Sequence, residues 1–242
     1  MMVFFPFEET FYRQAGVPVT WVGHPLVDRA KPALPQAQAI ERMGLNPWRK
    51  TVGLLPGSRA SEVKRHLPIM LQAAERIAGS MPGVQFLIPQ AESVDRSLLR
   101  PAVDDRACDI RIVQGALCDA LGAMDAAIVA SGTATLETAL CKVPMAVVYK
   151  TSWPTYLAAK AVVRIPDIAI VNVVAGKRVV PEFVQRQANP GRIAETVIKL
   201  LRDKPSSDAM VAELKQIAAK LGAPGAVERA AEAVLKEAAG RS

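Results

Sequence analysis

Residues 51–68 carry the sequence TVGLLPGSRASEVKRHLP, and this stretch decides the fold. The apolar run 52–55 predicts a buried strand, and the helical spacing of the apolar residues that follow predicts a helix over 61–79. Pro68 should kink that helix or limit its first turn. Strand and helix meet at the turn Pro56-Gly57-Ser58-Arg59. A strand joined directly to a helix is the repeating unit of a parallel α/β sheet.

The same alternation continues in both directions along the chain. Residues 23–36, rich in proline and polar side chains, should form a linker. The pattern predicts an α/β fold, a Rossmann-like parallel sheet flanked by helices. Ligands of such sheets bind beyond the carboxyl ends of the strands, so the loops that follow strands should carry the chemistry. Further strands are predicted over 19–22, 84–88, 110–113, 126–129, 145–149 and 168–171, and further helices over 8–14, 37–43, 93–103, 116–124, 133–140, 154–163, 193–201, 207–221 and 223–239.

The composition argues against several classes of protein. No apolar run approaches the ~20 residues of a membrane-spanning helix, and the first residues do not resemble a signal peptide. With 3 cysteines, 2 histidines and no CxxC spacing, we expect neither a disulfide framework nor a zinc site, and no cofactor. The net charge of +7 suits an acidic ligand, an anionic membrane or simply a solvated surface. Nucleic acid is not expected, because aromatic residues make up only 5% and no recognition signature is present.

The turn at 56–59 has the features of an anion-binding loop. Gly57 permits a close approach of the backbone to a ligand, and Ser58 or Ser61 is placed to cap the helix. The free N–H groups of the first helical turn favour an anion, and Arg59 adds a planar cation suited to phosphate. The motif is equally compatible with an ordinary capped turn that carries a surface arginine.

A second turn of this kind lies in VASGTATLETAL, residues 129–140. The predicted strand ends in Ser131-Gly132-Thr133-Ala134, small residues that leave the backbone amides accessible. Glu137 could accept hydrogen bonds from ribose hydroxyls, or it could be a first-turn acid favoured by the helix dipole. Neither turn matches a P-loop or a GxGxxG fingerprint. Two anion-friendly turns at one sheet edge predict a site for a diphosphate with a sugar or nucleoside attached.

Four other residues are candidates for this site or for a structural role near it. Lys150 and Asn172 each follow or end a predicted strand, where a side chain can reach a ligand. His24, in the linker, should serve a structural turn, and His66 should lie on a polar helix face. No GxSxG nucleophile elbow is present, so a serine hydrolase lacks support.

Five segments together resemble the lipid-A-disaccharide synthase family, and they follow the family's order across most of residues 4–185. They are FPFEETFYRQAGVPVTWVGHPLVD, LLPGSRASEV, ASGTATLETAL, VVYK and IVNVVAGKRVVPEFVQ. The resemblance implies the C-terminal half of a two-domain glycosyltransferase of the GT-B type. It also implies a hexosyltransferase of Gram-negative lipid A biosynthesis. Such an enzyme transfers 2,3-diacylglucosamine from UDP-2,3-diacylglucosamine to 2,3-diacylglucosamine 1-phosphate (lipid X), with inversion.

The resemblance also implies roles for individual residues. The donor UDP-sugar would meet Gly57, Ser58 and Arg59 on its diphosphate or uridine side, Ser131, Gly132, Thr133 and Ala134 at a phosphate, Glu137 at the ribose, and Lys150 and Asn172 elsewhere in the donor site. The family often has Arg-Glu where this chain has Lys177-Arg178, so no role is carried over to that pair.

By the same resemblance, residues 1–22 would be a remnant of the N-terminal acceptor domain, and 23–242 the donor-binding domain with its terminal helices. The catalytic base proposed in the family is an aspartate in the N-terminal portion that this chain lacks. We therefore expect the chain to bind UDP or UDP-sugar and to transfer little or nothing. A cytoplasmic location, peripheral at the anionic inner-membrane surface, and a homodimer are implied as well. Lys160 and Arg164 could face the membrane, or they could be the rim of a core-facing helix.

Two alternatives stay open at this point. One is another GT-B enzyme acting on UDP-N-acetylglucosamine, such as a 2-epimerase, although 2 histidines are few for that chemistry. The other is a non-catalytic module that binds nucleotide sugars, which the missing N-terminal domain favours.

Overall fold

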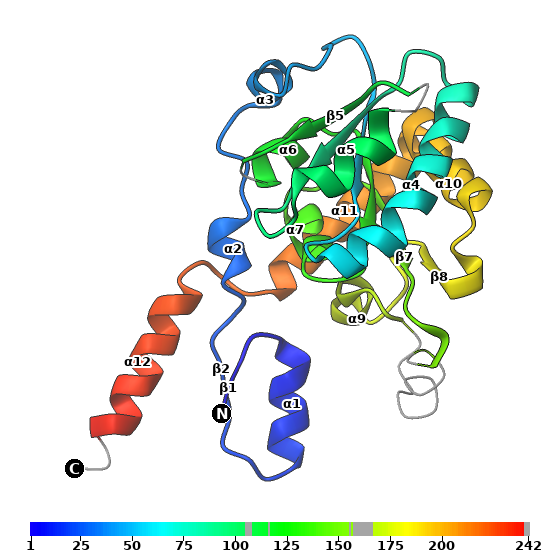
Figure 1. Ribbon diagram of the computed structural model, residues 1–242. Helices are drawn as coiled ribbons and strands as arrows, with labels where there is room; N and C mark the ends of the chain where they lie inside the picture. Colours follow the sequence, from blue (N-terminus) through cyan, green and yellow to red (C-terminus); the bar gives the residue numbers. More distant parts are fainter. Residues whose placement is uncertain (105–107, 116, 155, 157–166, 240–242) are drawn as a thin grey trace.

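A six-stranded parallel sheet forms the main body of the computed structural model, which describes residues 1–104, 108–115, 117–154, 156 and 167–239 (Figure 1). The strand order is β5-β4-β3-β6-β7-β8, and every neighbouring pair is parallel. This arrangement confirms the predicted fold class. The strands are β3 (Thr51–Leu55), β4 (Gln85–Pro89), β5 (Ile110–Val113), β6 (Ala126–Ala130), β7 (Met145–Tyr149) and β8 (Glu182–Val184).

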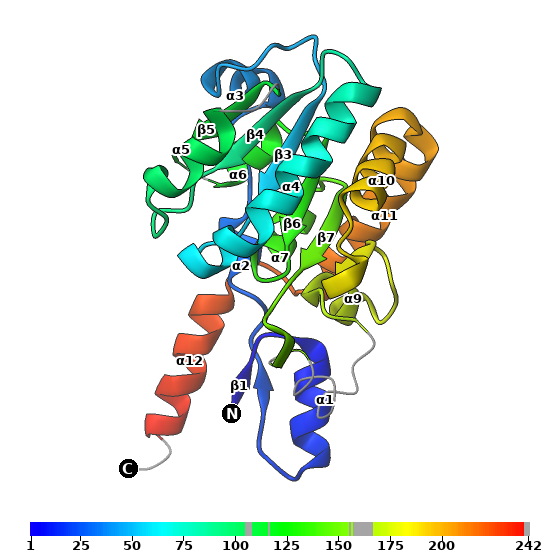
Figure 2. The ribbon, with the colours of Figure 1, turned by 45° about the vertical axis from the view of Figure 1, so that its right-hand side comes forward.

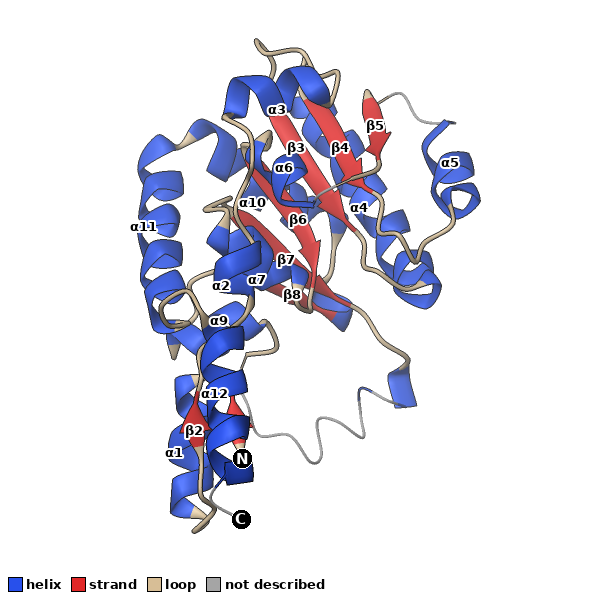
Figure 3. Cartoon of the chain, turned by 90° about the vertical axis from the view of Figure 1, so that its left-hand side faces the viewer, coloured by secondary structure: helices blue, strands red, loops and turns tan. Residues whose placement is uncertain are grey.

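Helices cover both faces of the sheet (Figure 3). One face packs against α4 (Ala60–Ser80), α5 (Arg96–Asp104) and α10 (Pro190–Arg202). The opposite face packs against α3 (Gln36–Arg42), α6 (Leu117–Gly122), α7 (Ala134–Leu140), α9 (Ile170–Ala175) and α11 (Lys204–Lys220).

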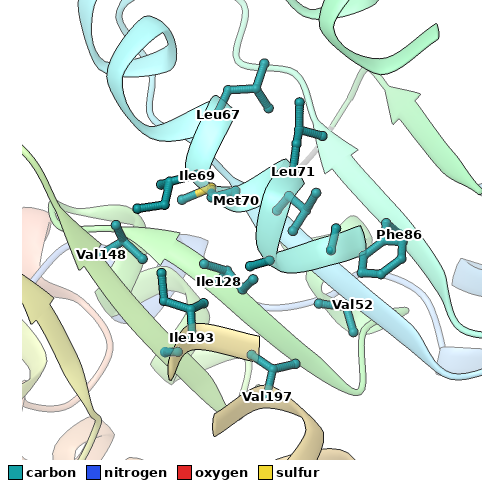
Figure 4. Close-up of a cluster of buried hydrophobic side chains, with 14 of the residues drawn as sticks. Val52, Leu67, Ile69, Met70, Leu71, Phe86, Ile128, Val148, Ile193 and Val197 are labelled. Atoms are coloured by element: carbon teal, nitrogen blue, oxygen red, sulfur yellow. The ribbon is translucent and has the colours of Figure 1, made fainter. Parts of the chain in front are cut away.

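Alternate residues of each central strand enter opposite cores, which is why these strands are apolar throughout. In β7, Val148 packs toward α4 and α10, whereas Val147 packs toward the helices of the other face. Figure 4 shows the first core, where Ile128 and Val148 of the sheet meet Met70 of α4. Full burial of a side chain of this size contributes roughly 1.5–3 kcal/mol. The two cores thus fix which strand ends lie side by side at the carboxyl edge.

The first residues form a small separate unit below the main sheet (Figure 2). β1 (Met2–Val3) and β2 (Thr20–Trp21) pair in parallel, with α1 (Pro6–Gln14) between them in sequence. Where the chain leaves this unit, Arg229 of α12 (Ala226–Ala239) donates hydrogen bonds to the carbonyls of Val22, Ala223 and Pro224. The division of the chain at residue 22 stays a prediction. In the described part of the chain, no helix has the length and apolar character needed to cross a bilayer.

Several predicted elements differ from the structure. The expected strand 168–171 is wrong, because the chain there enters helix α9, whose start is held by tertiary hydrogen bonds described below. The strand β8 was not predicted, and the expected linker contains the short helix α2 (Leu26–Arg29). Helix α4 continues through Pro68 to Ser80, in agreement with the helix predicted over 61–79. The expected helix over 154–163 lies largely outside the described residues.

Candidate functional site

Three loops meet at the carboxyl edge of the sheet, after β3, β6 and β7 (Figure 3). The register pairs Leu55 with Val129 and Ala130 with Val148, so these neighbouring strands end close to one another. The predicted site residues of these loops therefore share one edge, as the sequence indicated. They are Gly57, Ser58 and Arg59 after β3, Ser131, Gly132, Thr133 and Ala134 after β6, and Lys150 after β7.

The turn after β3 is capped from within, which corrects the expectation of a serine cap and of free amides at Ser58 and Arg59. The carboxylate oxygen Oε2 of Glu62 accepts the N–H groups of Ser58 at 2.9 Å and of Arg59 at 3.3 Å. Neither serine caps, because a glutamate at the third helical position reaches back to the turn. Gly57 has a φ of +121°, a conformation that favours glycine. These two amides are therefore not available to an anion at this turn.

Arg59 is the side chain best placed to do so. Its Nη1 lies 3.2 Å from Oε1 of Glu62, and the arginine side chain is 79% exposed. Exposed pairs of this type contribute only about 0.3–0.5 kcal/mol, so the guanidinium can leave Glu62 at little cost. Arg59 is thus an exposed cation at the edge of the sheet, paired only weakly with Glu62.

The turn after β6 has one occupied backbone donor, followed by three that are open among the described residues. Ser131 donates its N–H to the carbonyl of Val148 at 2.9 Å, and its hydroxyl to the carbonyl of Ile168 at 3.3 Å. Among the described residues, nothing accepts a hydrogen bond from the N–H groups of Gly132, Thr133 or Ala134. These three donors lie at the start of α7, where the helix dipole favours negative charge.

Glu137 lies in the first turn of α7 and is half-buried. Burial raises the pKa of its carboxyl above the ordinary value, and Arg29 of α2 opposes this shift. A carboxylate in such a place is a strong hydrogen-bond acceptor once ionised, because water solvates it poorly.

The loop after β7 is held by two residues whose role the sequence analysis missed. The imidazole of His66 accepts the N–H of Lys150 at Nε2 over 3.1 Å, and its Nδ1 contacts the carbonyl of Pro56 at 3.1 Å. Gln185 accepts the N–H of Thr151 and donates to its carbonyl, both at 3.1 Å. The prediction that His66 lies on a polar face is wrong, since only 3% of the residue is exposed. Its spacing from Val63 and Met70 could have placed it on the buried face of α4.

Lys150 itself borders a shallow basic groove between α4 and the start of α10. Arg65, Lys150 and Arg186 line it, together with uncharged residues. The guanidinium of Arg186 also stacks over the ring of Trp153, 5.2 Å from its centroid. The groove places additional positive charge beside the carboxyl edge.

Asn172 lies elsewhere than a strand tip. It is inside α9 and fully buried, with 0% exposed. Its side-chain amide donates to the carbonyl of Val180 and to Glu182, and accepts the N–H groups of Val179 and Val180. Both donors and both acceptor positions are occupied. Asn172 thus fixes the backbone near the edge and has no side-chain hydrogen bond left for a ligand.

The remaining charged candidates have structural partners or lie outside the description. Lys177 pairs with Glu213 and Arg178 with Asp167, each at 2.8 Å. His24 serves a structural turn as predicted, since its Nδ1 accepts the N–H of Leu26. Lys160 and Arg164 lie outside the described residues.

Comparison with known proteins adds the family. The LpxB family model, lipid-A-disaccharide synthetase, matches residues 1–236. A lipid-A-disaccharide synthase of Anaeromyxobacter dehalogenans is 45% identical over 236 residues, which are 97% of this chain but 61% of the relative. The chain therefore spans less than two thirds of that relative's length.

Solved structures agree on the fold. A UDP-GlcNAc 2-epimerase of Neisseria meningitidis bound to UDP-GlcNAc has a TM-score of 0.60 at 13% identity. The superposition covers 97% of this chain and 60% of the epimerase chain. A sucrose-phosphate synthase of Thermosynechococcus elongatus has a TM-score of 0.59 at 13% identity. That superposition covers 100% of this chain and 58% of the synthase chain. At this identity the likeness concerns the fold alone, the α/β sheet of GT-B proteins. The family model and the curated relative decide the family: this chain belongs to the lipid-A-disaccharide synthetase family.

Proposed function

We propose that this chain forms the donor-binding part of a lipid-A-disaccharide synthase and holds UDP-2,3-diacylglucosamine at the carboxyl edge of its sheet. The observation that carries the proposal is the meeting of two loops on the neighbouring strands β3 and β6. One loop offers the exposed guanidinium of Arg59, and the other offers the open N–H groups of Gly132–Ala134. A cation beside oriented amides suits a diphosphate, and the family supplies its class, a UDP-sugar.

In the proposed reaction, the hydroxyl oxygen of lipid X attacks the anomeric carbon of the donor sugar from the face opposite UDP. The bond from that carbon to the β-phosphate oxygen breaks, and UDP leaves with the electron pair, so the configuration inverts. Arg59 and the amides at the start of α7 would stabilise the charge that develops on the diphosphate. The hydroxyl proton passes to a general base, a role that we assign to no residue of this chain.

The other predicted residues take supporting places in this proposal. Glu137, ionised, would accept hydrogen bonds from the ribose hydroxyls, and Lys150 would add a cation at the next loop. Asn172 would act through the backbone that it fixes rather than by touching the donor. The family also extends the proposal to the cytoplasmic face of the anionic inner membrane and to a homodimer. The net charge of +7 supports the membrane part.

Isothermal titration with UDP tests the donor site. The wild type should bind, and Arg59→Ala and Glu137→Ala should each weaken binding by about tenfold or more, the effect expected for loss of a hydrogen bond to a charged group. Arg13→Ala is a matched control, because Arg13 is likewise exposed and paired with a nearby glutamate, Glu9, but lies on α1. If UDP does not bind, or if all variants bind as the wild type does, the donor-site assignment is rejected.

Two activity assays test the rest of the proposal. Transfer of labelled 2,3-diacylglucosamine by this chain alone should be little or none. Turnover typical of the family would contradict a role that is limited to donor binding. Incubation with UDP-N-acetylglucosamine should leave the sugar unchanged. Appearance of its 2-epimer would instead support the alternative enzyme class.

A further inference from the structure

A buried histidine joins two loops of the proposed donor site. His66 projects from α4 to contact Pro56, which precedes the Gly57–Arg59 turn, and the N–H of Lys150, which follows β7. The strands β3 and β7 are not neighbours, because β6 lies between them. The imidazole therefore links two loops that no ladder of backbone hydrogen bonds connects directly.

The chemistry of the two contacts fixes the state of the ring. The N–H of Lys150 can only donate, so Nε2 carries a lone pair, and the carbonyl of Pro56 can only accept, so Nδ1 carries the proton. Only neutral imidazole offers both groups at once. Burial lowers the pKa of His66, which favours the neutral ring. The hydrogen bond to Pro56 and the charge of Glu62 oppose that shift, and Arg65 adds to it. From the loop after β7, the backbone N–H of Lys150 contacts the ring.

Gln185 secures the same loop from the other side. Its two hydrogen bonds with Thr151, both at 3.1 Å, hold the peptide next to Lys150. Gln185 is buried, with 7% exposed, and has a φ of +50°, which is uncommon for a residue with a side chain. The backbone of Lys150 and Thr151 is thus held by side chains from α4 and from the turn that follows β8.

We propose that His66, supported by Gln185, is a positioning residue that couples the Arg59 turn to Lys150, so that both cations are presented to one diphosphate. His66 does not contact the ligand in this scheme. It acts by keeping the two loops at a fixed separation, which lowers the cost of ordering them when the ligand binds. The identity of the ligand rests on the proposed function.

A double-mutant cycle measures this coupling. His66→Asn keeps a donor near Pro56 but loses the acceptor for Lys150, and it should weaken UDP binding about tenfold. Arg59→Ala should weaken binding about tenfold in the wild type but only about twofold to threefold in the His66→Asn background. His24→Asn serves as the control, because His24 is also buried and hydrogen-bonded, yet contacts Leu26 and the Phe4 and Phe5 rings instead. Its effect should simply add to that of Arg59→Ala.

An equal loss from Arg59→Ala in both backgrounds would overturn the coupling. If His66→Asn does not fold, Gln185→Gly takes its place in the cycle, since glycine accepts the left-handed φ and removes both bonds to Thr151. Nitrogen-15 spectra of the wild type give a test that needs no ligand. At a solution pH below 6.5, the ordinary pKa of histidine, the ring of His66 should still be neutral and should carry its proton on Nδ1. If the protein binds UDP but His66 carries its proton on Nε2, the positioning role of His66 is rejected and the proposed function stands. If UDP does not bind at all, the proposed function is rejected as well.

Discussion

Replacing Asn172 separates a structural role from direct contact with the donor. Its amide nitrogen donates to the carbonyl of Val180 at 2.9 Å and to Oε1 of Glu182 at 2.7 Å. Its amide oxygen accepts the N–H groups of Val179 at 2.8 Å and Val180 at 2.9 Å. Asn172→Ala removes all four hydrogen bonds in a place that water does not reach.

The expected cost follows from these contacts. A buried hydrogen bond contributes about 0.5–1.5 kcal/mol net, so four of them make a loss of about 4 kcal/mol in the free energy of unfolding. For a chain of this size, such a loss lowers the melting temperature by about 10 °C. Asn189→Ala is the matched control, because Asn189 caps α10 at an exposed position and its loss should cost about 1 kcal/mol.

Asn172→Asp adds a dependence on pH. The new carboxyl would face the carbonyl of Val180 and the carboxylate of Glu182, so burial and like charge should raise its pKa in the folded protein above the unfolded value. A group with a raised folded-state pKa favours folding at low pH and loses that contribution as pH rises through the folded value. The deficit in stability relative to the wild type should therefore grow from acidic to alkaline pH.

Urea unfolding followed by circular dichroism at acidic and alkaline pH measures these differences, and UDP titration at low temperature measures binding by the folded variants. If Asn172→Ala keeps the stability of the wild type but loses UDP affinity, then Asn172 contacts the donor and the reasoning from its buried bonds is refuted.

Three further predictions concern the edge loops. Gly57→Ala should lower stability by about 1–3 kcal/mol in thermal melting, because the φ of +121° disfavours a side chain and the new Cβ would lie 2.6 Å from Cβ of Glu62. Glu62→Gln should cost about 1 kcal/mol by weakening the cap of α4 and should change UDP affinity by less than about threefold, since its exposed pair with Arg59 is weak. Affinity for UDP-N-acetylglucosamine should fall as pH drops through the raised pKa of Glu137, because only the carboxylate accepts both ribose hydroxyls, and Glu137→Gln should flatten that profile.

The sheet could be predicted because its central strands lie between two cores. Residues of β6 and β7 are buried on both faces, so each strand is a continuous apolar run bounded by turn residues. In a parallel sheet the carboxyl ends of all strands lie at one edge, so the sequence also predicted that Gly57–Arg59 and Ser131–Ala134 lie at the same edge. Local pattern was sufficient here because a helix begins within five residues of the end of β3 and of β6.

The contacts that organise the edge could not be predicted, because they join residues far apart in sequence. His66 and Lys150 are separated by 84 positions, and Thr151 and Gln185 by 34. The helix α9 shows the same limit: its β-branched residues favour a strand. Glu182 nevertheless accepts the N–H groups of Ile168 and Ala169, and these bonds fix the start of the helix.

Two kinds of polar group therefore lie at this edge, and they have different roles. Within the described part of the chain, every buried side-chain nitrogen and oxygen has a hydrogen-bond partner, including those of His66, Asn172 and Glu182. These groups have their bonding capacity used, so they set the geometry of the loops. The capacity to bind an anion belongs to groups that solvent reaches, such as Arg59. A sequence motif contains both kinds, which explains why Asn172 was predicted to touch the ligand together with residues that remain open to it.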